Sequence, residues 1–464
     1  MLDNKIVDEV KRFGQTHLLK YWDTFTPKQQ SAFANQLSSI DFKLIKRLFE
    51  GDEAQPDWAA LAASAGPPDA IRLGESNPRI KKEDAIEAGR KALRSGRIAM
   101  ILVAGGQGTR LGFSNPKGMF PIGPLSNRTL FEMHIDRLRA VMKRYQVSIP
   151  MYVMTSPATD TDTRLFLSDH DGFGLASDQL RIFCQGSMPA IDSKTGKILL
   201  SDKGEIALSP DGHGGLLAAM AKNGCLEDAG DAGIDHFFYA QVDNPMVEIC
   251  DPLLIGYHLL AESEMTTQVV RKTFPLERVG NVVSIDGKTQ IIEYSDLPKD
   301  VAEKTDSDGS LLLWAGNIAV HVFKRQFLES VQHSAEGLPF HHAKKPVPYL
   351  DSDGLIVKPS EANAIKFERF VFDLLPMAKT ALVVESDPAE VFAPVKNADG
   401  AASDTPKTVK QAISNLHRRW LEKAGASVAQ TARIEIHPNW ALDADGVRER
   451  VDGSFNISSD TYLQ

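Results

Sequence analysis

Apolar and polar positions along the chain form two alternating patterns. Short, mostly apolar runs of strand length end at glycine or at a polar residue, and they occupy residues 100–104, 151–155, 180–185 and 237–242. Between such runs, stretches such as residues 129–142 place apolar residues three or four positions apart, as on one face of a helix. Because strands that alternate with helices usually pair in parallel, the pattern predicts an α/β fold with a mostly parallel sheet.

The region before this alternation has patterns of its own. Residues 1 to about 50 carry apolar side chains at helical spacing and predict helices. Residues 51 to about 77 are rich in Ala, Gly and Pro, which predicts a linker. Residues 83–94 predict a further helix that leads into the strand at residue 100.

The second half of the chain predicts a hairpin, more strands and one long helix. Runs at 282–285 and 290–294 flank Asp286-Gly287, a common hairpin turn. Further apolar runs predict strands at 311–314 and 382–385, and Thr405-Pro406 predicts the start of a helix that reaches Leu421. We therefore divide the chain into a helical N-terminal segment (1–95), a Rossmann-like core (96–380) and a small β-rich C-terminal domain (381–464).

Composition excludes some classes of partner. The 464 residues carry a net charge of −9, which argues against a general affinity for nucleic acid or anionic membranes. The three cysteines form no C-x-x-C pair, so we expect neither a zinc site nor a redox pair. The first residues lack the apolar core of a signal peptide, and no apolar run is long enough to span a bilayer. We expect a cytoplasmic protein without a membrane partner, as a monomer or weak homo-oligomer.

A glycine-rich loop directly follows the apolar run at 100–104. Glycine exposes its backbone, and successive N–H groups can form a concave nest for an anion. The loop contains Gly105, Gly106, Gly108 and Gly112. Arg110 and Lys117 add a forked cation and a compact positive charge near the same strand end. The loop therefore predicts a polyphosphate site, with a tight turn beside unrelated charges as the alternative.

Two common phosphate-loop patterns do not fit this loop. The ATPase pattern G-x-x-x-x-G-K-[ST] is absent at this spacing. The dinucleotide pattern G-x-G-x-x-G matches Gly106 and Gly108 but meets Leu111 at its third glycine. The next helix is expected only near Thr129, where Thr129 and Glu132 form a potential capping box. A nicotinamide-binding fold would begin its helix directly at the loop.

Chemically useful residues also follow other strands. Gly105, Gln185 and Asp243 each lie at the end of a predicted strand, where ligands bind in open α/β sheets. Asp243 is a carboxylate of the kind that Mg²⁺ takes together with substrate phosphates. The alternative for Asp243-Asn244-Pro245 is a strand-end turn.

With these motifs in place, the chain resembles the eukaryotic-type UDP-sugar pyrophosphorylases, and most of all those that make UDP-N-acetylglucosamine. The resemblance runs from about residue 97 to residue 425. The matching motifs are L-V-A-G-G-Q-G-T-R-L-G (102–112), P-K-G-M (116–119), P-D-G-H-G-G-L (210–216), V-D-N (242–244), V-G-N-V-V (279–283), I-E-Y-S (292–295), A-G-N-I-A (315–319), A-I-K-F-E-R-F-V-F-D (364–373) and P-V-K-N-A-D (394–399).

The resemblance implies a nucleotidyltransferase core that joins a sugar 1-phosphate to UTP and releases pyrophosphate with Mg²⁺. It implies that Arg110, Lys117 and Lys396 act on the phosphates and that Asp243 binds or adjoins the metal. It implies UTP contacts by Ala104, Gly105, Gly106, Gly108, Thr109, Gln185, Gly212, Asp243 and Lys366. It implies sugar contacts by His213, Gly280, Glu293, Tyr294 and Asn317.

Several alternatives stay open. Relatives that use N-acetylated sugars usually have Asn where this chain has His213, and UDP-glucose-type relatives often have His there, so glucose or galactose 1-phosphate is the alternative substrate. A second alternative is a nucleotide-sugar-binding protein that has lost catalysis. Single residues also have plain structural interpretations, because Glu293 could be an exposed hairpin residue, Asn317 a turn residue, and Lys366 and Lys396 surface charges. We interpret His341-His342 and Cys184 as structural residues.

Overall fold

The computed structural model describes residues 2–51, 57–75, 77, 79–332 and 338–464. The chain forms two compact units, each made of three separate segments. One unit contains residues 1–57, 185–216 and 338–371, and the other contains residues 58–184, 217–337 and 372–464. Each unit is described by itself below, and the predicted three-part division at residues 95 and 380 stays a prediction.

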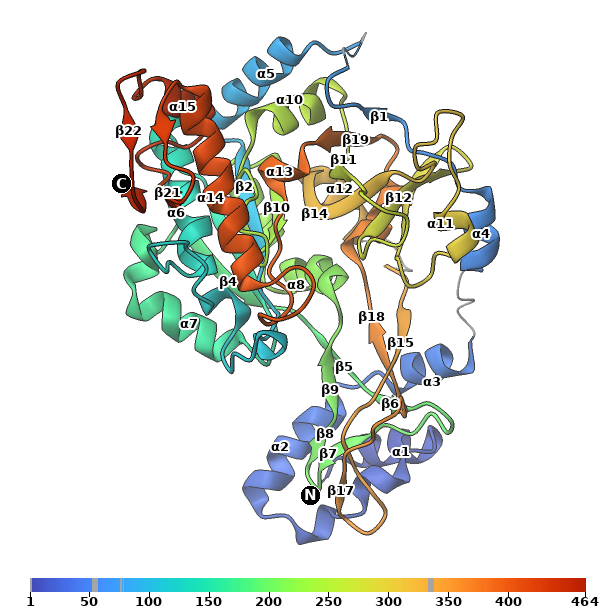
Figure 1. Ribbon diagram of the computed structural model, residues 1–464. Coiled ribbons are helices and arrows are strands. Elements are labelled where there is room, and N and C mark those ends of the chain that lie inside the picture. Colours follow the sequence, from blue (N-terminus) through green and yellow to red (C-terminus); the bar gives the residue numbers. More distant parts are fainter. Residues whose placement is uncertain (1, 52–56, 76, 78, 333–337) are drawn as a thin grey trace. The chain divides into compact units, whose positions relative to one another are not determined.

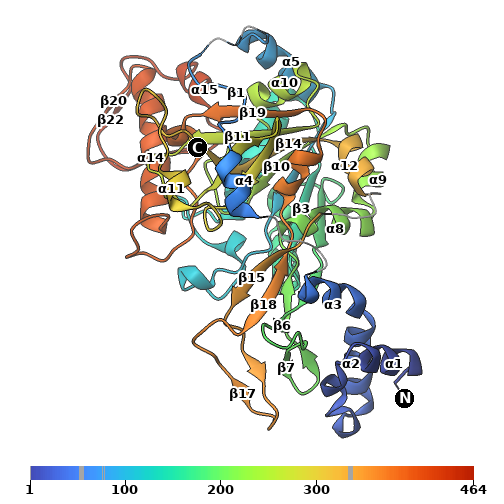
Figure 2. The same cartoon turned by 90° about the vertical axis from the view of Figure 1, so that its right-hand side faces the viewer.

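The larger unit is built on a mixed central sheet, which can be followed in Figures 1 and 2. Its main strand order is β1-β19-β11-β14-β10-β2-β3-β4, and the hairpin β12-β13 extends from β14. Neighbours pair in parallel except at β14 and in this hairpin. The strands are β1 (Ala70–Ile71), β2 (Ile98–Val103), β3 (Met151–Thr155), β4 (Leu180–Cys184), β10 (His236–Gln241), β11 (Met265–Arg271), β12 (Gly280–Ile285), β13 (Lys288–Ile292), β14 (Ala315–Lys324) and β19 (Ala381–Ser386). The predicted α/β class with a mostly parallel sheet is confirmed.

Helices and short strands complete the larger unit. The helices are α4 (Trp58–Ser64), α5 (Lys82–Arg94), α6 (Leu130–Tyr145), α7 (Asp160–Asp169), α8 (Leu216–Lys222), α9 (Cys225–Asp231), α10 (Pro252–Leu260), α11 (Lys299–Ala302), α12 (Arg325–Gln332), α13 (Pro388–Val391), α14 (Pro406–Lys423) and α15 (Ala444–Arg448). The strands β20 (Ser427–Val428), β21 (Ile434–Ile436), β22 (Asn456–Ile457) and β23 (Thr461–Leu463) follow α14. Thr129 and Thr405 begin α6 and α14 with capping boxes, as the sequence predicts for Thr129. In the part of the chain that the structure describes, no helix combines the length and apolar character needed to cross a membrane.

Two sequence predictions are wrong in this unit. Residues 311–314 were expected to be a strand, but the long strand β14 begins only at Ala315. Leu313 and Trp314 are buried without lying in a strand, and an apolar run alone does not distinguish these cases. The expected linker at 51–77 contains α4, whose alanines favour a helix, and the short strand β1. Residues 52–56 and 76 of that expected linker lie outside the described part.

Side chains from the strands fill layers on both faces of the central sheet. Met100 and Leu102 on β2 pack in one cluster with Ile135 and Leu138 of α6. On β10, Phe238 belongs to the same cluster, whereas the adjacent Tyr239 packs against Phe323 of β14. This alternation follows from the two-residue period of a strand. Because the middle of each strand is filled by packing, the candidate site residues follow the strand ends.

Helices α5 and α10 approach each other at glycines. A Cβ on Gly89 would lie 1.9 Å from the carbonyl oxygen of Pro252, and a Cβ on Gly256 would lie 1.7 Å from that of Ala85. Because only glycine fits at such distances, these residues fix how closely the helices pack. Helix α10 follows the loop that contains Asp243, so this contact also supports the site.

We expect Gly256→Ala to lower the free energy of unfolding by about 1–3 kcal/mol, because the added methyl group would force the two helices apart. Denaturant unfolding measures this change. Gly453→Ala is the control, because a Cβ there would meet nothing within 4 Å. Equal stability of Gly256→Ala and wild type would contradict the packing described here.

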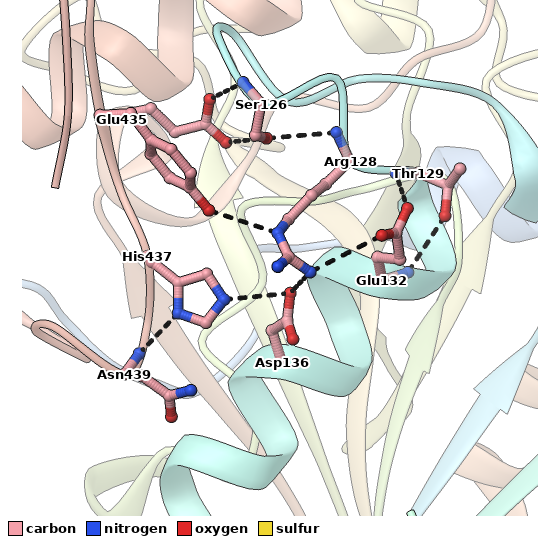
Figure 3. A network of polar contacts seen from close by, with 9 residues as sticks. Ser126, Arg128, Thr129, Glu132, Asp136, Glu435, His437 and Asn439 are labelled. Atoms are coloured by element: carbon pink, nitrogen blue, oxygen red, sulfur yellow. Dashed lines mark hydrogen bonds and ion pairs between the residues drawn. The ribbon is translucent and has the colours of Figure 1, made fainter. Parts of the chain in front are cut away.

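The end of the chain is fastened to α6 by the polar network in Figure 3. Asp136 on α6 accepts a hydrogen bond from Arg128 Nη1 at 2.6 Å and lies 3.4 Å from His437 Nε2. Arg128 Nε also donates to the Tyr462 hydroxyl at 3.3 Å. Glu435 accepts from the Ser126 hydroxyl at 2.6 Å. The network therefore holds β21 and β23 against the helix that carries the core of the larger unit.

The smaller unit combines N-terminal helices with short strand pairs. Its helices are α1 (Asn4–Arg12), α2 (Pro27–Ser38) and α3 (Phe42–Glu50), which confirm the predicted helical start of the chain. Its strands are β5 (Ser187–Pro189), β6 (Ile191–Asp192), β7 (Leu200–Asp202), β8 (Glu205–Ile206), β9 (Leu208–Pro210), β15 (His341–Lys345), β16 (Tyr349–Leu350), β17 (Ile356–Val357) and β18 (Ala364–Glu368). The core joins Phe33, Leu37 and Leu48 from the helices to Ile191 and Phe367 from the strands.

Candidate active site

The glycine-rich loop lies at the end of β2 and folds back on itself. Lys117 N donates to the carbonyl oxygen of Gly106 at 3.0 Å, and Gly108 N donates to that of Asn115 at 3.0 Å. A Cβ on Gly108 would lie 2.7 Å from the ring of Phe113, so this position requires glycine. Ala104 is buried at the start of the loop, whereas Gly106 and Thr109 are exposed. The loop therefore presents exposed backbone beside the Lys117 segment.

The structure brings Lys117 and Asp243 together from different strand ends. Lys117 Nζ lies 3.6 Å from Asp243 Oδ2, and the two side chains are 18% and 15% exposed. Asp243 follows β10, which lies beside β2 in parallel register, so the two loops meet at one edge of the sheet. This contact pairs a lysine ammonium group with a carboxylate, and both side chains are partly exposed.

A later segment closes over the same edge. Val395 N donates to the carbonyl oxygen of Asp243 at 2.8 Å, and Ala398 N donates to that of Arg110 at 3.1 Å. Lys396 lies between these two residues, and its Nζ is 5.9 Å from the centre of the Phe392 ring. Residues 395–398 thus place Lys396 between Asp243 and the exposed Arg110, as one continuous phosphate-binding region would require.

Two acidic residues that the sequence analysis missed belong to this region. Burial raises the pKa of Asp404, and the charges of Asp243 and Glu277 raise it further, whereas Lys396 lowers it. Asp404 accepts hydrogen bonds through its carbonyl oxygen from Lys396 N at 2.8 Å and Asn397 N at 3.0 Å. The only sequence signal for Asp404 is its position directly before Thr405, which caps α14. A helix cap by itself does not indicate a functional site.

The candidate sugar-binding residues of the larger unit also lie together. Gly280 pairs with Asn317 across β12 and β14. A Cβ on Gly280 would lie 3.1 Å from Glu293 Oε1 and 3.7 Å from Asn317 Cβ. Asn317 Oδ1 accepts a hydrogen bond from Ala319 N at 3.0 Å, where β14 has an irregular register. Tyr294 follows Glu293 and is 47% exposed. Gly280 and Glu293 of the hairpin therefore lie close to Asn317 of β14.

The remaining candidates lie in the smaller unit. Gln185 is buried, and the adjacent Gly186 accepts a hydrogen bond through its carbonyl oxygen from Asp211 N at 3.2 Å. Gly212 has a φ of +83°, and a Cβ there would lie 2.3 Å from the carbonyl oxygen of Arg369, so only glycine fits. The pairing of β5 with β9 therefore brings the Gln185 and Gly212 segments together. Lys366 is half-buried on β18.

His213 follows Gly212 and has a fixed orientation. Its Nδ1 accepts a hydrogen bond from Val371 N at 3.1 Å, and its ring stacks on Phe370 at 5.3 Å. Burial, and to a lesser extent the charge of His341, lower the pKa of His213 to about 4. His213 is therefore neutral at pH 7, and its Nε2 carries the ring proton. The rings of His341 and His342 pack on Phe370 and Phe367 respectively, and the described residues include no group of three or more His, Cys, Asp or Glu suited to a metal.

Comparisons with known proteins show the family of the chain. A family model described as UTP–glucose-1-phosphate uridylyltransferase matches residues 67–439. A human protein named UDP-N-acetylhexosamine pyrophosphorylase-like protein 1 is 37% identical over 93% of this chain and 87% of its own. UDP-N-acetylglucosamine pyrophosphorylase of Saccharomyces cerevisiae is 36% identical over 91% of this chain and 92% of its own.

Solved structures give the same result. A putative UDP-N-acetylglucosamine pyrophosphorylase from Entamoeba histolytica matches with a TM-score of 0.79 and 32% identity, over 86% of this chain and all of that one. The Trypanosoma brucei uridine diphosphate N-acetylglucosamine pyrophosphorylase matches with a TM-score of 0.80 and 26% identity, over 96% and 94% of the two chains.

The fold, the family model and the relatives show an enzyme of the nucleotidyltransferase class. The chain belongs to the UTP–glucose-1-phosphate uridylyltransferase family, whose model covers most of its length. The resemblance to UDP-sugar pyrophosphorylases inferred from the sequence motifs is thereby confirmed.

Proposed function

We propose that this enzyme transfers a uridylyl group from UTP to N-acetylglucosamine 1-phosphate and releases pyrophosphate. The observation that carries this proposal is the meeting of Lys117 and Asp243 beside the glycine-rich loop. The relatives named for UDP-N-acetylglucosamine support the choice of sugar. Glucose 1-phosphate is the second candidate, because UDP-glucose-type relatives often have His at the position of His213.

The chemistry of the reaction fits the residues present. A phosphate oxygen of the sugar 1-phosphate attacks the α-phosphorus of UTP as pyrophosphate departs in line. This phosphate is already ionised at pH 7, so the enzyme needs no general base. It must position the two anions and neutralise the charge that develops on the phosphate oxygens. In our proposal, Arg110, Lys117 and Lys396 provide that charge, and the glycine-rich loop provides backbone donors.

Asp243 also fits a magnesium ion. Mg²⁺ is commonly held by one or two carboxylates together with substrate phosphates and water, so a single well-placed carboxylate is sufficient. The Asp243 side chain is 15% exposed and already lies beside a cation, as expected for a carboxylate that would exchange Lys117 for a metal. When bound, the metal would neutralise charge on the phosphate oxygens.

The proposal is tested by pyrophosphate release from UTP with a panel of sugar 1-phosphates. Release with N-acetylglucosamine 1-phosphate as the preferred substrate would support it. Preference for glucose 1-phosphate would support the second candidate. Binding of UDP-sugar without release from any sugar phosphate would favour a binding protein that has lost catalysis.

We expect His213→Asn to shift the ratio of kcat/KM values toward the N-acetylated sugar by about 10-fold, the size expected for a changed pocket contact. An asparagine oxygen could still accept the hydrogen bond from Val371 N, so the loop should remain in place. The same panel of sugar phosphates measures the ratio. His170→Asn, at an exposed position of the larger unit, is the control. An unchanged panel would exclude His213 as a determinant of sugar preference.

We expect EDTA to abolish pyrophosphate release and added Mg²⁺ to restore it. Asp243→Asn should require a higher Mg²⁺ concentration for half-maximal rate, because the amide is a weaker ligand than the carboxylate. Asp286→Asn, in the exposed hairpin turn, should titrate like wild type. Activity that persists in EDTA would argue against a metal.

The three cysteines Cys184, Cys225 and Cys250 are not joined to one another by disulfides. We infer a reducing compartment such as the cytoplasm, because free thiols persist there.

A further inference from the structure

Lys272 is a buried lysine next to the candidate sugar site. It directly follows β11, and only 4% of the residue is exposed. Its Nζ donates to Asn281 Oδ1 at 2.5 Å and to the carbonyl oxygen of Pro275 at 3.2 Å. Both acceptors are neutral, and within the described ranges no ion pair between Lys272 and a carboxylate is formed. The sequence analysis did not single this residue out.

Keeping a lysine at this position is energetically costly. Burial lowers the pKa of Lys272 to about 8, and the charge of Glu277 raises it only in part. An apolar residue of similar length would avoid the cost of removing an ammonium group from water. A buried charge that is kept without an ionic partner needs another role, and fixing the arrangement of neighbouring segments is the best-attested one.

The contacts of Lys272 lead to the backbone of the sugar-binding hairpin. Asn281 is 1% exposed, and its Nδ2 donates to the carbonyl oxygens of Val279 at 3.4 Å and Ile292 at 3.3 Å. The Ile292 carbonyl belongs to the peptide bond that precedes Glu293. The ammonium of Lys272 therefore connects the end of β11, through Asn281, to the backbone on both sides of the candidate sugar site.

Strand alternation places this connection beneath the sugar-binding face. Asn281 and Gly280 are adjacent on β12, so they face opposite sides of the sheet. Gly280 shares its side with Glu293 and Asn317. On the other side, a Cβ on Gly316 would lie 3.4 Å from Lys272 Cγ. Lys272 thus packs against β12 and β14 on the side opposite to the candidate sugar-binding residues.

Lys272 also fastens the loop between β11 and β12. Its bond to Pro275 reaches into residues 273–278, and Glu277 closes this loop by accepting from Thr273 N at 2.7 Å and Thr273 Oγ1 at 3.0 Å. Glu277 is the residue whose charge acts on both Lys272 and Asp404. Glu277 therefore connects this loop electrostatically to Lys272 on one side and to Asp404 on the other.

We propose that Lys272 is a positioning residue for the sugar 1-phosphate, which fixes the hairpin bearing Gly280 and Glu293 through its bond to Asn281. This inference rests on the proposed function, and it names the part of the substrate that Lys272 governs. Lys272 acts on the sugar 1-phosphate and leaves UTP binding alone, because the hydrogen bonds of its side chain go only to the hairpin and the 273–278 loop among the described residues.

The first test compares the kinetic constants of Lys272→Met for the two substrates. We expect the KM for N-acetylglucosamine 1-phosphate to rise by about 10-fold or more, the size expected when a charged hydrogen bond is lost, with the KM for UTP within about twofold of wild type. Lys288→Met is the matched control, because Lys288 is exposed on the same hairpin. A KM for the sugar phosphate equal to that of the control would overturn the proposal. An equal rise of both KM values would also overturn it.

A second variant covers the case in which Lys272→Met does not fold. Lys272→Met combined with Asn281→Leu replaces both partners by apolar groups, which can leave stability nearly unchanged. We expect this double variant to keep the raised KM for the sugar phosphate while its melting temperature is close to that of wild type. A restored KM together with restored stability would show a purely structural role and overturn the proposal.

The pH dependence gives an independent measurement. In the wild type, the KM for the sugar phosphate should rise above about pH 8, because Lys272 loses its proton there. Two charged residues lie near Lys272, namely Glu277 in the loop and the adjacent Arg271, whose Nε donates to Glu385 of β19. The residues that β12 and β14 place against Lys272, Asn281 and Gly316, are neutral. Lys272→Met should lack this rise. If wild-type enzyme releases no pyrophosphate with this sugar, the proposed function fails before any variant is compared.

Discussion

Replacing Lys117 by alanine should lower kcat for pyrophosphate release by about 10²–10³-fold, the loss measured when one transition-state donor is removed. Lys117 Nζ lies 3.6 Å from Asp243 Oδ2. The backbone N–H of Lys117 donates to the carbonyl oxygen of Gly106 in the glycine-rich loop. In the proposed mechanism this ammonium group neutralises charge that develops on the phosphate oxygens. Single-turnover measurement with saturating substrates separates this step from binding.

The control for this experiment is Lys91→Ala, which removes an exposed lysine on α5. It should turn over like wild type, because a solvated surface charge has little effect at a distance. Arg110→Ala should lose activity to a degree comparable with Lys117→Ala, since both cations are proposed to hold the triphosphate. Wild-type turnover of Lys117→Ala would remove this residue from the mechanism.

The central strands were predictable because their sequences are apolar on both faces. Strands β2, β3 and β10 appear as continuous apolar runs, and the structure places them side by side in parallel. Strand β14 was not identified, because His321 interrupts its apolar run. His321 is fully buried and shares a hydrogen bond with Thr267 of β11, 3.1 Å from its Nδ1. Such a partner, 54 positions away, cannot be read from local periodicity.

The candidate site was predictable where its residues belong to strand-end motifs. The sequence located the glycine-rich loop, Lys117 and Asp243, and the structure shows the last two in contact. It did not locate Asp404, Glu277 or Lys272, because these are single polar residues without a pattern. Their importance comes from burial and mutual charge, which depend on how distant segments pack. Their roles, and those of the motif residues, stay predictions until variants are measured.

Packing behind the glycine-rich loop connects stability to catalysis. Gly118 is buried directly after Lys117, and a Cβ on Gly118 would lie 2.2 Å from the ring of Phe131. Phe131 is fully buried on α6 and packs on Phe166, so its ring has little freedom to move. A methyl group at Gly118 must therefore displace the segment that carries Lys117.

We expect Gly118→Ala to lower the free energy of unfolding by about 1–3 kcal/mol, as overpacking does. We also expect kcat to fall by about 10²-fold, because a shift of about 1 Å in a positioned group can cost this much. Denaturant unfolding and single-turnover rates measure the two effects on the same preparation. Adding Phe131→Leu should recover part of both losses by making room for the methyl group. If stability falls while kcat stays at the wild-type value, the position of Lys117 does not depend on this packing.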